Sequence, residues 1–259
     1  MIELRLLGPT DLRGVTPEDA SALLAQSKCV ALLAYLTVAA PGALQRRDRL
    51  VGMLWPELDQ EHARAALRKA IHQLRKTLGP DTLASRGDEE IGIAPGTLTC
   101  DAVEFDECVE KGYYSRALEL YRRGELLPGF FVADAGEFED WLERTRSDLH
   151  DKAAAAAWGL AARFEEGGDF TIATRFAREA ARLAPTDERM LRRVMQLLDR
   201  LGDRAGAMRV YEDFTKRLKR DYDAEPSKET QDLAAKIRRG SNGNRPEAPP
   251  GAPPPRQAR

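Results

Sequence analysis

The sequence has few of the residues on which most metal and redox chemistry depends. It contains three cysteines and three histidines among 259 residues, and no two cysteines form a CxxC pair. The histidines also show no metal-ligand spacing with the cysteines. We therefore expect no metal site and no disulfide framework, with the cysteines as buried or half-buried thiols in a reducing compartment.

Catalytic signatures are missing as well. No GxGxxG, GKS/T, HExxH or GxSxG motif occurs, which removes the common nucleotide, metalloprotease and serine-hydrolase sites. Neighbouring carboxylates such as Glu89-Glu90 and Glu165-Glu166 fall at expected turns, where solvated charge is the simpler interpretation. We expect neither enzyme activity nor a cofactor.

Long apolar runs and a strong net charge are absent too. No stretch approaches the roughly 18 apolar residues needed to cross a membrane, and MIELRLLGP lacks the apolar core of a signal peptide. We therefore expect a cytoplasmic protein with no membrane partner. With 40 basic and 42 acidic residues the formal net charge is −2, so a nucleic-acid site would have to arise from local patterning.

The strongest local pattern is DQEHARAALRKAIHQLRKTLGP, at residues 59–80. Asp59 is suited to cap a helix at its start, and Gly79-Pro80 is suited to end it. No acidic residue lies between His62 and Pro80, so the exposed face is basic. Apolar residues recur at steps of four, three and four, which predicts one buried stripe made of Leu67, Ile71, Leu74 and Leu78.

The surrounding pattern predicts a winged helix-turn-helix. Alternation from residue 1 to 14 predicts an antiparallel strand and a return strand near Leu12, and residues 18–22 fit a loop or a short strand. Helices are expected over residues 27–39 and 46–55, and a hairpin over residues 83–93. A strand, three helices and a hairpin wing in this order place helix 59–78 in the position that reads the major groove.

The exposed residues of that helix suit different DNA contacts. Arg68 and Gln73 have side chains that bind guanine and adenine in a bidentate manner, and His72 follows Arg68 on the same face. Phosphate contacts are expected of the residues nearer the helix start and flanks, namely Arg64, Lys69 and Lys76. Arg75, beside the apolar Leu74, fits a structural ion pair as well as a DNA contact.

Further arginines precede and follow this helix. Arg46, Arg47 and Arg49 lie at the start of the preceding helix, where free backbone amides favour a phosphate. Backbone anchoring and a solvated surface are equal alternatives for these three. Arg86, at the tip of the expected wing, is the basic residue placed to reach DNA from there.

The second half of the chain predicts only helices. They are expected at residues 103–110, 114–122, 135–166, 169–183, 187–201, 204–222 and 227–238. Gly168-Asp169 and Gly202-Asp203 lie 34 residues apart between amphipathic helices, with Ala173 and Ala207 at the same offset and Pro185 closing the first unit. This spacing is typical of a degenerate tetratricopeptide (TPR) repeat.

We expect an α+β winged helix-turn-helix domain at residues 1–102 and an all-α TPR-like domain at residues 103–239. Residues 240–259 carry six prolines and no apolar stripe, which predicts a disordered Pro-rich tail.

In this order of elements the chain resembles the SARP family of bacterial transcriptional regulators. The resemblance covers residues 1–238 and is carried by Leu50, Leu54-Trp55-Pro56, Ala63-Arg64, Leu67, Ile71, Leu74-Arg75, Leu78-Gly79, Cys100-Asp101, Phe105, Leu118, Leu126-Leu127-Pro128-Gly129-Phe130, Trp141, Arg144, Arg146, Gly168-Asp169, Pro185, Gly202-Asp203, Ala207, Tyr211 and Glu225-Pro226-Ser227.

The resemblance implies a sequence-specific DNA-binding regulator, more often an activator. It further implies a winged helix of the response-regulator type on double-stranded DNA and a bacterial transcriptional activation domain that contacts the winged helix, RNA polymerase or both. Homodimerisation and tandem binding on direct repeats are both open.

The expected wing departs from the family pattern. Its tip reads Arg86-Gly87-Asp88-Glu89-Glu90, which is mostly acidic, whereas the wings of the family usually present basic residues. Carboxylates near DNA phosphates would be repelled by about 1 kcal/mol each before screening. The alternative is therefore a TPR-like protein-interaction scaffold or adaptor whose winged helix docks another protein.

Overall fold

Two short strands at the start of the chain pair in an antiparallel ladder, β1 (Ile2–Arg5) with β2 (Asp11–Arg13). In β1 the apolar residues are buried and the charged ones half-buried, as the alternation predicts. β6 (Leu98–Cys100) adds to β1 in parallel and completes the sheet order β2-β1-β6. The structure, a computed structural model, describes residues 1–240, and these divide into two compact units, residues 1–184 and residues from Pro185 onward.

A helix occupies the region for which the sequence suggested a loop or short strand, and that expectation was wrong. α1 (Pro17–Leu24) begins after Thr16, whose side chain accepts a hydrogen bond from the amide of Asp19. Proline at the first helical position and acidic residues in the first turn are ordinary start signals. The winged helix therefore contains one more helix than the three predicted.

The remaining helices and the wing follow the predicted order. α2 (Ser27–Val38) is buried on nearly all sides, and α3 (Arg47–Leu54) and α4 (Gln60–Leu78) follow it. After the 3₁₀ turn η1 (Pro80–Thr82), the strands β4 (Leu83–Arg86) and β5 (Glu90–Ile93) form the hairpin wing. The two-residue strand β3 (Gln45–Arg46) pairs with β5, so the wing sheet has the order β3-β5-β4. The winged helix-turn-helix is confirmed.

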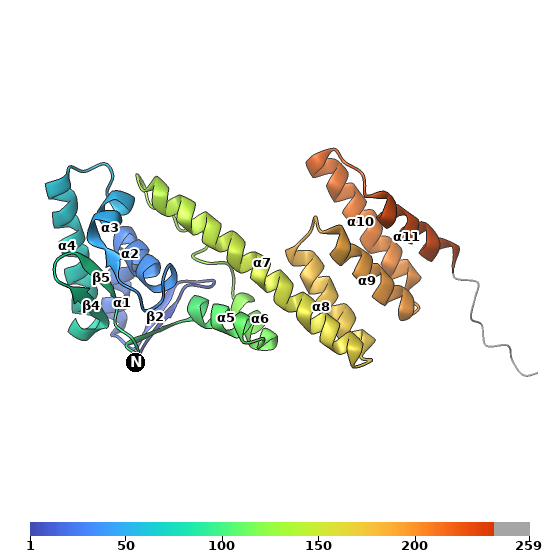
Figure 1. The fold of residues 1–259 in the computed structure, drawn as a ribbon, viewed down its shortest axis with the longest axis horizontal. Helices are drawn as coiled ribbons and strands as arrows, with labels where there is room; N and C mark the ends of the chain where they lie inside the picture. Colours follow the sequence, from blue (N-terminus) through green and yellow to red (C-terminus); the bar gives the residue numbers. More distant parts are fainter. Residues whose placement is uncertain (241–259) are drawn as a thin grey trace, which may run out of the picture. The chain divides into compact units, whose positions relative to one another are not determined.

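Four further helices belong to the same unit. They are α5 (Asp101–Glu110), α6 (Tyr114–Tyr121), the long α7 (Gly136–Glu166) and α8 (Phe170–Leu183). Figure 1 shows α7 running from the neighbourhood of α2 and α3 to α8, with which it packs side by side. The winged helix and the first helices of the second half thus share one compact unit.

The segment that follows α6 pairs antiparallel with the chain that follows β1. The amide of Leu127 donates to the carbonyl of Leu6 at 2.8 Å, and the amide of Gly8 donates to the carbonyl of Glu125 at 2.9 Å. The two backbones lie so close that a Cβ on Gly8 would lie 2.1 Å from the carbonyl oxygen of Arg123. The helical half is therefore attached to the winged helix through main-chain hydrogen bonds as well as side-chain packing.

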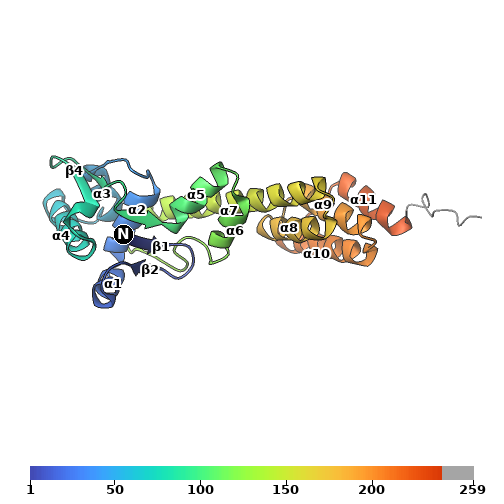
Figure 2. The same cartoon turned by 90° about the horizontal axis from the view of Figure 1, so that it is seen from below.

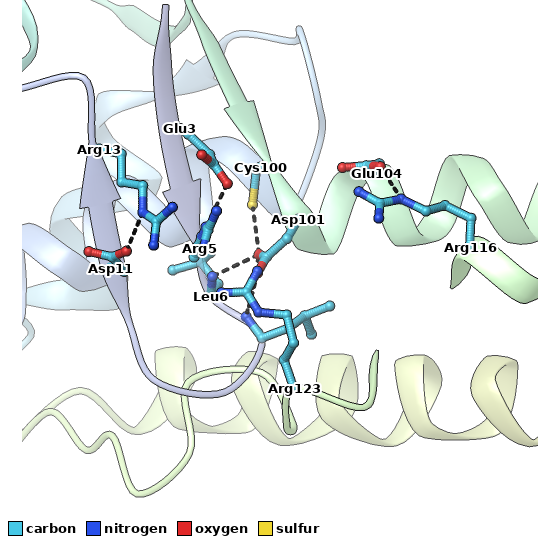
Figure 3. A network of polar contacts seen from close by, with 11 residues as sticks. Glu3, Arg5, Leu6, Asp11, Arg13, Cys100, Asp101, Glu104, Arg116 and Arg123 are labelled. Atoms are coloured by element: carbon cyan, nitrogen blue, oxygen red, sulfur yellow. Dashed lines mark hydrogen bonds and ion pairs between the residues drawn. The ribbon is translucent and has the colours of Figure 1, made fainter. Parts of the chain in front are cut away.

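A buried carboxylate joins the same two parts. Asp101, the first residue of α5, accepts hydrogen bonds from the amides of Leu6 (2.7 Å) and Leu7 (3.3 Å) and pairs with Arg123 at 3.2 Å (Figure 3). Burial raises the pKa of Asp101, and the two backbone amides and the guanidinium oppose that rise.

The second compact unit contains α9 (Glu188–Arg200), α10 (Arg204–Tyr222) and α11 (Lys228–Arg239). The Asp203 side chain caps α10 by accepting from the amide of Gly206, as the Asp169 side chain caps α8 by accepting from Ile172. The two Gly-Asp pairs that defined the repeat thus perform the same local task, with a positive φ at each glycine.

In the described part of the chain no single helix is long and apolar enough to span a membrane. Only α1 and α2 together reach the required length and composition, and they are bent by 96°. The predicted Pro-rich tail lies outside the described residues, apart from Gly240.

Candidate nucleic-acid interface

α4 is built so that its two faces differ sharply. Asp59 caps it as predicted, accepting a hydrogen bond from the amide of His62 at 3.0 Å, and this bond is the main cause of the lowered pKa of Asp59. Gly79 ends the helix with a φ of 95°. The predicted stripe is buried, and three further residues of the same helix, Ala63, Ala70 and Thr77, are buried with it.

The opposite face of α4 presents a basic line to solvent. Arg64, Arg68, His72 and Lys76 follow one another at steps of four and are all exposed, with Lys69 exposed beside them and Gln73 half-buried. Within residues 1–240, Arg68, Lys69 and Lys76 take part in no ion pair. In Figures 1 and 2, α4 lies at the edge of the first unit away from α5 and α6, so these helices do not cover it.

The three arginines near the start of α3 have different surroundings. Arg46 is exposed, whereas the Arg49 guanidinium lies 5.9 Å from the centre of the Tyr35 ring. Arg47 has a side chain that is only 18% exposed; it pairs with Asp88 of the wing tip at 3.5 Å and reaches the hydroxyl of Ser85 at 3.5 Å. Arg46 is thus the most accessible of the three for a phosphate.

The sequence left two roles for Arg75, a DNA contact and a structural one. Its hydrogen bonds favour the structural role. Its guanidinium donates to the Ser85 hydroxyl at 3.0 Å and to the Leu83 carbonyl at 3.5 Å. Arg47 of α3 and Arg75 of α4 thus converge on one serine of β4, and together they hold the wing against the helices.

The exposed arginines share a hollow with carboxylates. A cavity of about 400 Å³ opens between α3, the first half of α4 and the wing tip. It is lined by Arg46, Arg47, Asp48, Arg64, Leu67, Arg68, Asp88 and Glu89. Arg64 pairs with Asp48 at 3.0 Å, and Arg86 at the wing pairs with Glu90 at 3.1 Å. Sequence reasoning missed Asp48, although an acid in a first helical turn is a recognisable signal.

The described residues contain no group of three or more potential ligands placed to hold a metal ion. Cys29, Cys100 and Cys108 are buried and form no disulfide, as expected of core thiols. Burial raises the pKa of Cys100 to about 12, so this thiol stays protonated and unreactive near neutral pH.

Comparison with known proteins agrees with the sequence patterns. The family model of the bacterial transcriptional activator domain matches residues 100–238. No curated protein matches the chain significantly. Among solved structures, Mycobacterium tuberculosis EmbR in complex with a low-affinity phosphopeptide is similar in fold, with a TM-score of 0.64 and 20% identity. The similarity covers 92% of this chain and 65% of the EmbR chain.

Proposed function

Because the chain belongs to the bacterial transcriptional activator domain family and is a SARP-type transcriptional regulator, as its motifs predicted, we propose that it binds double-stranded DNA sequence-specifically. Members of this family are transcription factors rather than enzymes. In the proposed complex, residues 1–102 bind the duplex and α4 lies in the major groove.

The observation that carries this proposal is the unobstructed basic face of α4. Arg68 has no ion pair within the described residues, and its planar guanidinium suits the O6 and N7 acceptors of guanine. The partly exposed amide of Gln73 suits adenine, and His72 lies between them along the helix. Phosphate contacts are assigned to the surrounding basic residues, namely Arg64, Lys69, Lys76 and Arg46.

Arg47, Arg49 and Arg86 are assigned smaller contributions to DNA affinity. Arg47 already pairs with Asp88, Arg49 lies against Tyr35, and Arg86 pairs with Glu90. Arg64 likewise has to give up its pairing with Asp48. A phosphate has to compete with each of these partners, so we expect smaller losses on their removal than on removal of Lys69 or Lys76.

We further propose that residues 103–239 form the activating part of the protein, which contacts RNA polymerase or a second copy. The main-chain pairing after α6 and the Asp101 network support this proposal, because they fix the start of the helical part against the DNA-binding part. Transcription would then be raised by a helical domain held beside the promoter.

One observation favours a second candidate function, docking of another protein by the winged helix. The wing tip exposes Asp88 and Glu89, and Asp88 is fully exposed even though it pairs with Arg47. Carboxylates at this position repel phosphates and suit a basic protein segment. On this alternative the protein is an adaptor and does not bind duplex DNA.

A salt titration separates the two functions. The full chain is incubated with a random-sequence duplex pool and with any duplexes enriched from it, and affinity is measured by fluorescence anisotropy at several salt concentrations. A DNA reader that contacts about six phosphates should lose roughly a thousandfold in affinity between 50 and 200 mM salt. Absence of duplex binding at every salt concentration would reject the DNA-binding proposal in favour of docking.

A further inference from the structure

Two arginines of the proposed DNA-binding face are already occupied by carboxylates. Asp48, in the first turn of α3, holds Arg64 at 3.0 Å, and Asp88 of the wing tip holds Arg47 at 3.5 Å. Both pairs border the 400 Å³ hollow into which a DNA backbone would bring its phosphates. Arg68 borders the same hollow and has no such partner within residues 1–240.

The Asp48–Arg64 ion pair contributes little to folding. The side chains of Asp48 and Arg64 are 63% and 48% exposed, and pairs this exposed are screened by water and salt. The Asp48 carboxylate instead weakens the attraction between the hollow and an approaching anion. A phosphate that takes Arg64 must displace Asp48 or sit beside it, and two anions at that spacing repel.

We propose that Asp48 weakens DNA binding by pairing with Arg64 and so keeping it from the phosphate backbone, and that Asp88 acts on Arg47 in the same way. We call this effect the brake. This inference rests on the proposed function and adds a specific role to residues outside α4. In the free protein the carboxylate neutralises Arg64, and on binding it is exchanged for a phosphate. Because phosphate contacts are independent of sequence, the brake lowers affinity for every duplex by the same factor.

The brake leaves the ratio of specific to non-specific affinity unchanged and increases the fraction of the protein that is free of DNA. Most DNA in a cell is non-specific competitor, and binding to it depends on phosphate contacts alone. A protein whose arginines are partly neutralised spends less time on that competitor. The base contacts assigned to Arg68 and Gln73 lie outside the Asp48–Arg64 pair and keep their preference.

The test uses the full chain with Asp48→Asn, which removes the charge and keeps the shape. Asp11→Asn is the matched control, because Asp11 forms an exposed pair with Arg13 at 2.8 Å on β2, away from the hollow, and the change in net charge is the same. Affinity for a random-sequence duplex and for a selected duplex is measured by anisotropy. We expect Asp48→Asn to bind both about two- to fivefold more tightly than the control and to steepen the salt slope by about one.

A double-mutant cycle assigns the gain to the pair. In an Arg64→Ala background, Asp48→Asn should tighten binding less than it does in the wild type, because only the direct repulsion between Asp48 and a phosphate remains. Equal affinities of Asp48→Asn and Asp11→Asn, in a protein that does bind duplexes, would overturn the brake and leave the proposed function standing. A gain of undiminished size in the absence of Arg64 would also overturn it. If neither the wild type nor Asp48→Asn binds any duplex, the proposed function itself fails, and the brake fails with it.

Discussion

The Asp101 carboxylate accepts a hydrogen bond from the amide of Leu6 at 2.7 Å, joining residues 95 positions apart in the chain. The same carboxylate accepts from Leu7 and pairs with Arg123, so it joins the chain after β1, the start of α5 and the chain after α6 (Figure 3). Its side chain is 4% exposed, which means that these partners cannot be replaced freely by water.

Asp101→Ala should destabilise the first unit by about 1–3 kcal/mol for each buried amide left without an acceptor. The measurement is urea unfolding followed by circular dichroism and tryptophan fluorescence. Asp11→Ala, at an exposed pair on β2, is the control and should change the free energy of unfolding by less than about 1 kcal/mol. Equal effects of the two substitutions would show that the Asp101 network does not fasten the unit.

Gly8→Ala should disrupt the pairing of the chain after β1 with the chain after α6. The new methyl group would lie 2.1 Å from the carbonyl oxygen of Arg123, so one backbone has to move. Gly42→Ala is a matched control, because Gly42 has nearly the same φ (74° against 76°) but open space around it. The difference between the two losses of stability, about 1–3 kcal/mol, measures the steric clash alone. No difference would mean that the two backbones separate at little cost.

Arg68→Ala and Lys76→Ala should weaken DNA binding in different ways. If Arg68 reads a base, its removal costs about 1–3 kcal/mol on the selected duplex and relaxes the preference at one position. Lys76→Ala should weaken all duplexes alike and flatten the salt slope by about one. Binding of selected and random duplexes by both variants distinguishes these patterns. Unchanged binding in both would remove the basic face of α4 from the interface.

Glu188 should control the start of α11. Its carboxylate accepts from the amide of Ser227 at 2.9 Å and from the hydroxyls of Ser227 and Thr230, so it satisfies the first turn of a helix on another segment. Glu188→Ala should cost α11 about 0.5–2 kcal/mol of local stability, as loss of a helix cap does. Amide hydrogen exchange of residues 228–239 reports this directly, with α9 and α10 as internal references.

The same contact should make α11 sensitive to acid. Burial raises the pKa of Glu188, but the hydrogen bonds from Ser227 and Thr230 outweigh it and leave that pKa lowered. Its stabilising effect is therefore complete above the ordinary pKa of a glutamate and is lost as the pH falls through the lowered value. Protection of α11 should fall over this acidic range in the wild type and stay flat in Glu188→Gln. A parallel fall in the variant would assign the pH dependence to another group.

Much of the proposed interface could be predicted from the sequence because it is periodic. The buried stripe from Leu67 to Leu78, the Asp59 cap and the Gly79 stop are local signals, and each is confirmed in α4. The start of α1 carried local signals too, at Thr16 and Pro17, but its eight residues are too short for periodicity to stand out. The assignment of individual DNA contacts and the boundary at residues 102 and 103 stay predictions.

The rest could not be predicted because it depends on partners that are distant in the chain. Arg46 and Arg47 are identical in type and adjacent, yet one faces solvent and the other reaches Ser85 and Asp88 of the wing. Arg75 reaches the same serine, so its structural role becomes visible only when β4 is in place. Asp101 likewise shows no periodic relation to Leu6, because their contact follows from the parallel pairing of β6 with β1.

The length of α7 has a mechanical consequence. Its 31 residues extend about 46 Å at 1.5 Å per residue. Near one end, the Trp141 ring meets Tyr35 of α2 edge-on at 5.0 Å, and near the other, Phe164 stacks on Phe176 of α8 at 5.7 Å. A tilt of one degree about Trp141 would move the far end by about 0.6 Å. Because the two aromatic contacts lie so far apart on one helix, a small change of tilt where α7 meets α2 is magnified where α7 meets α8.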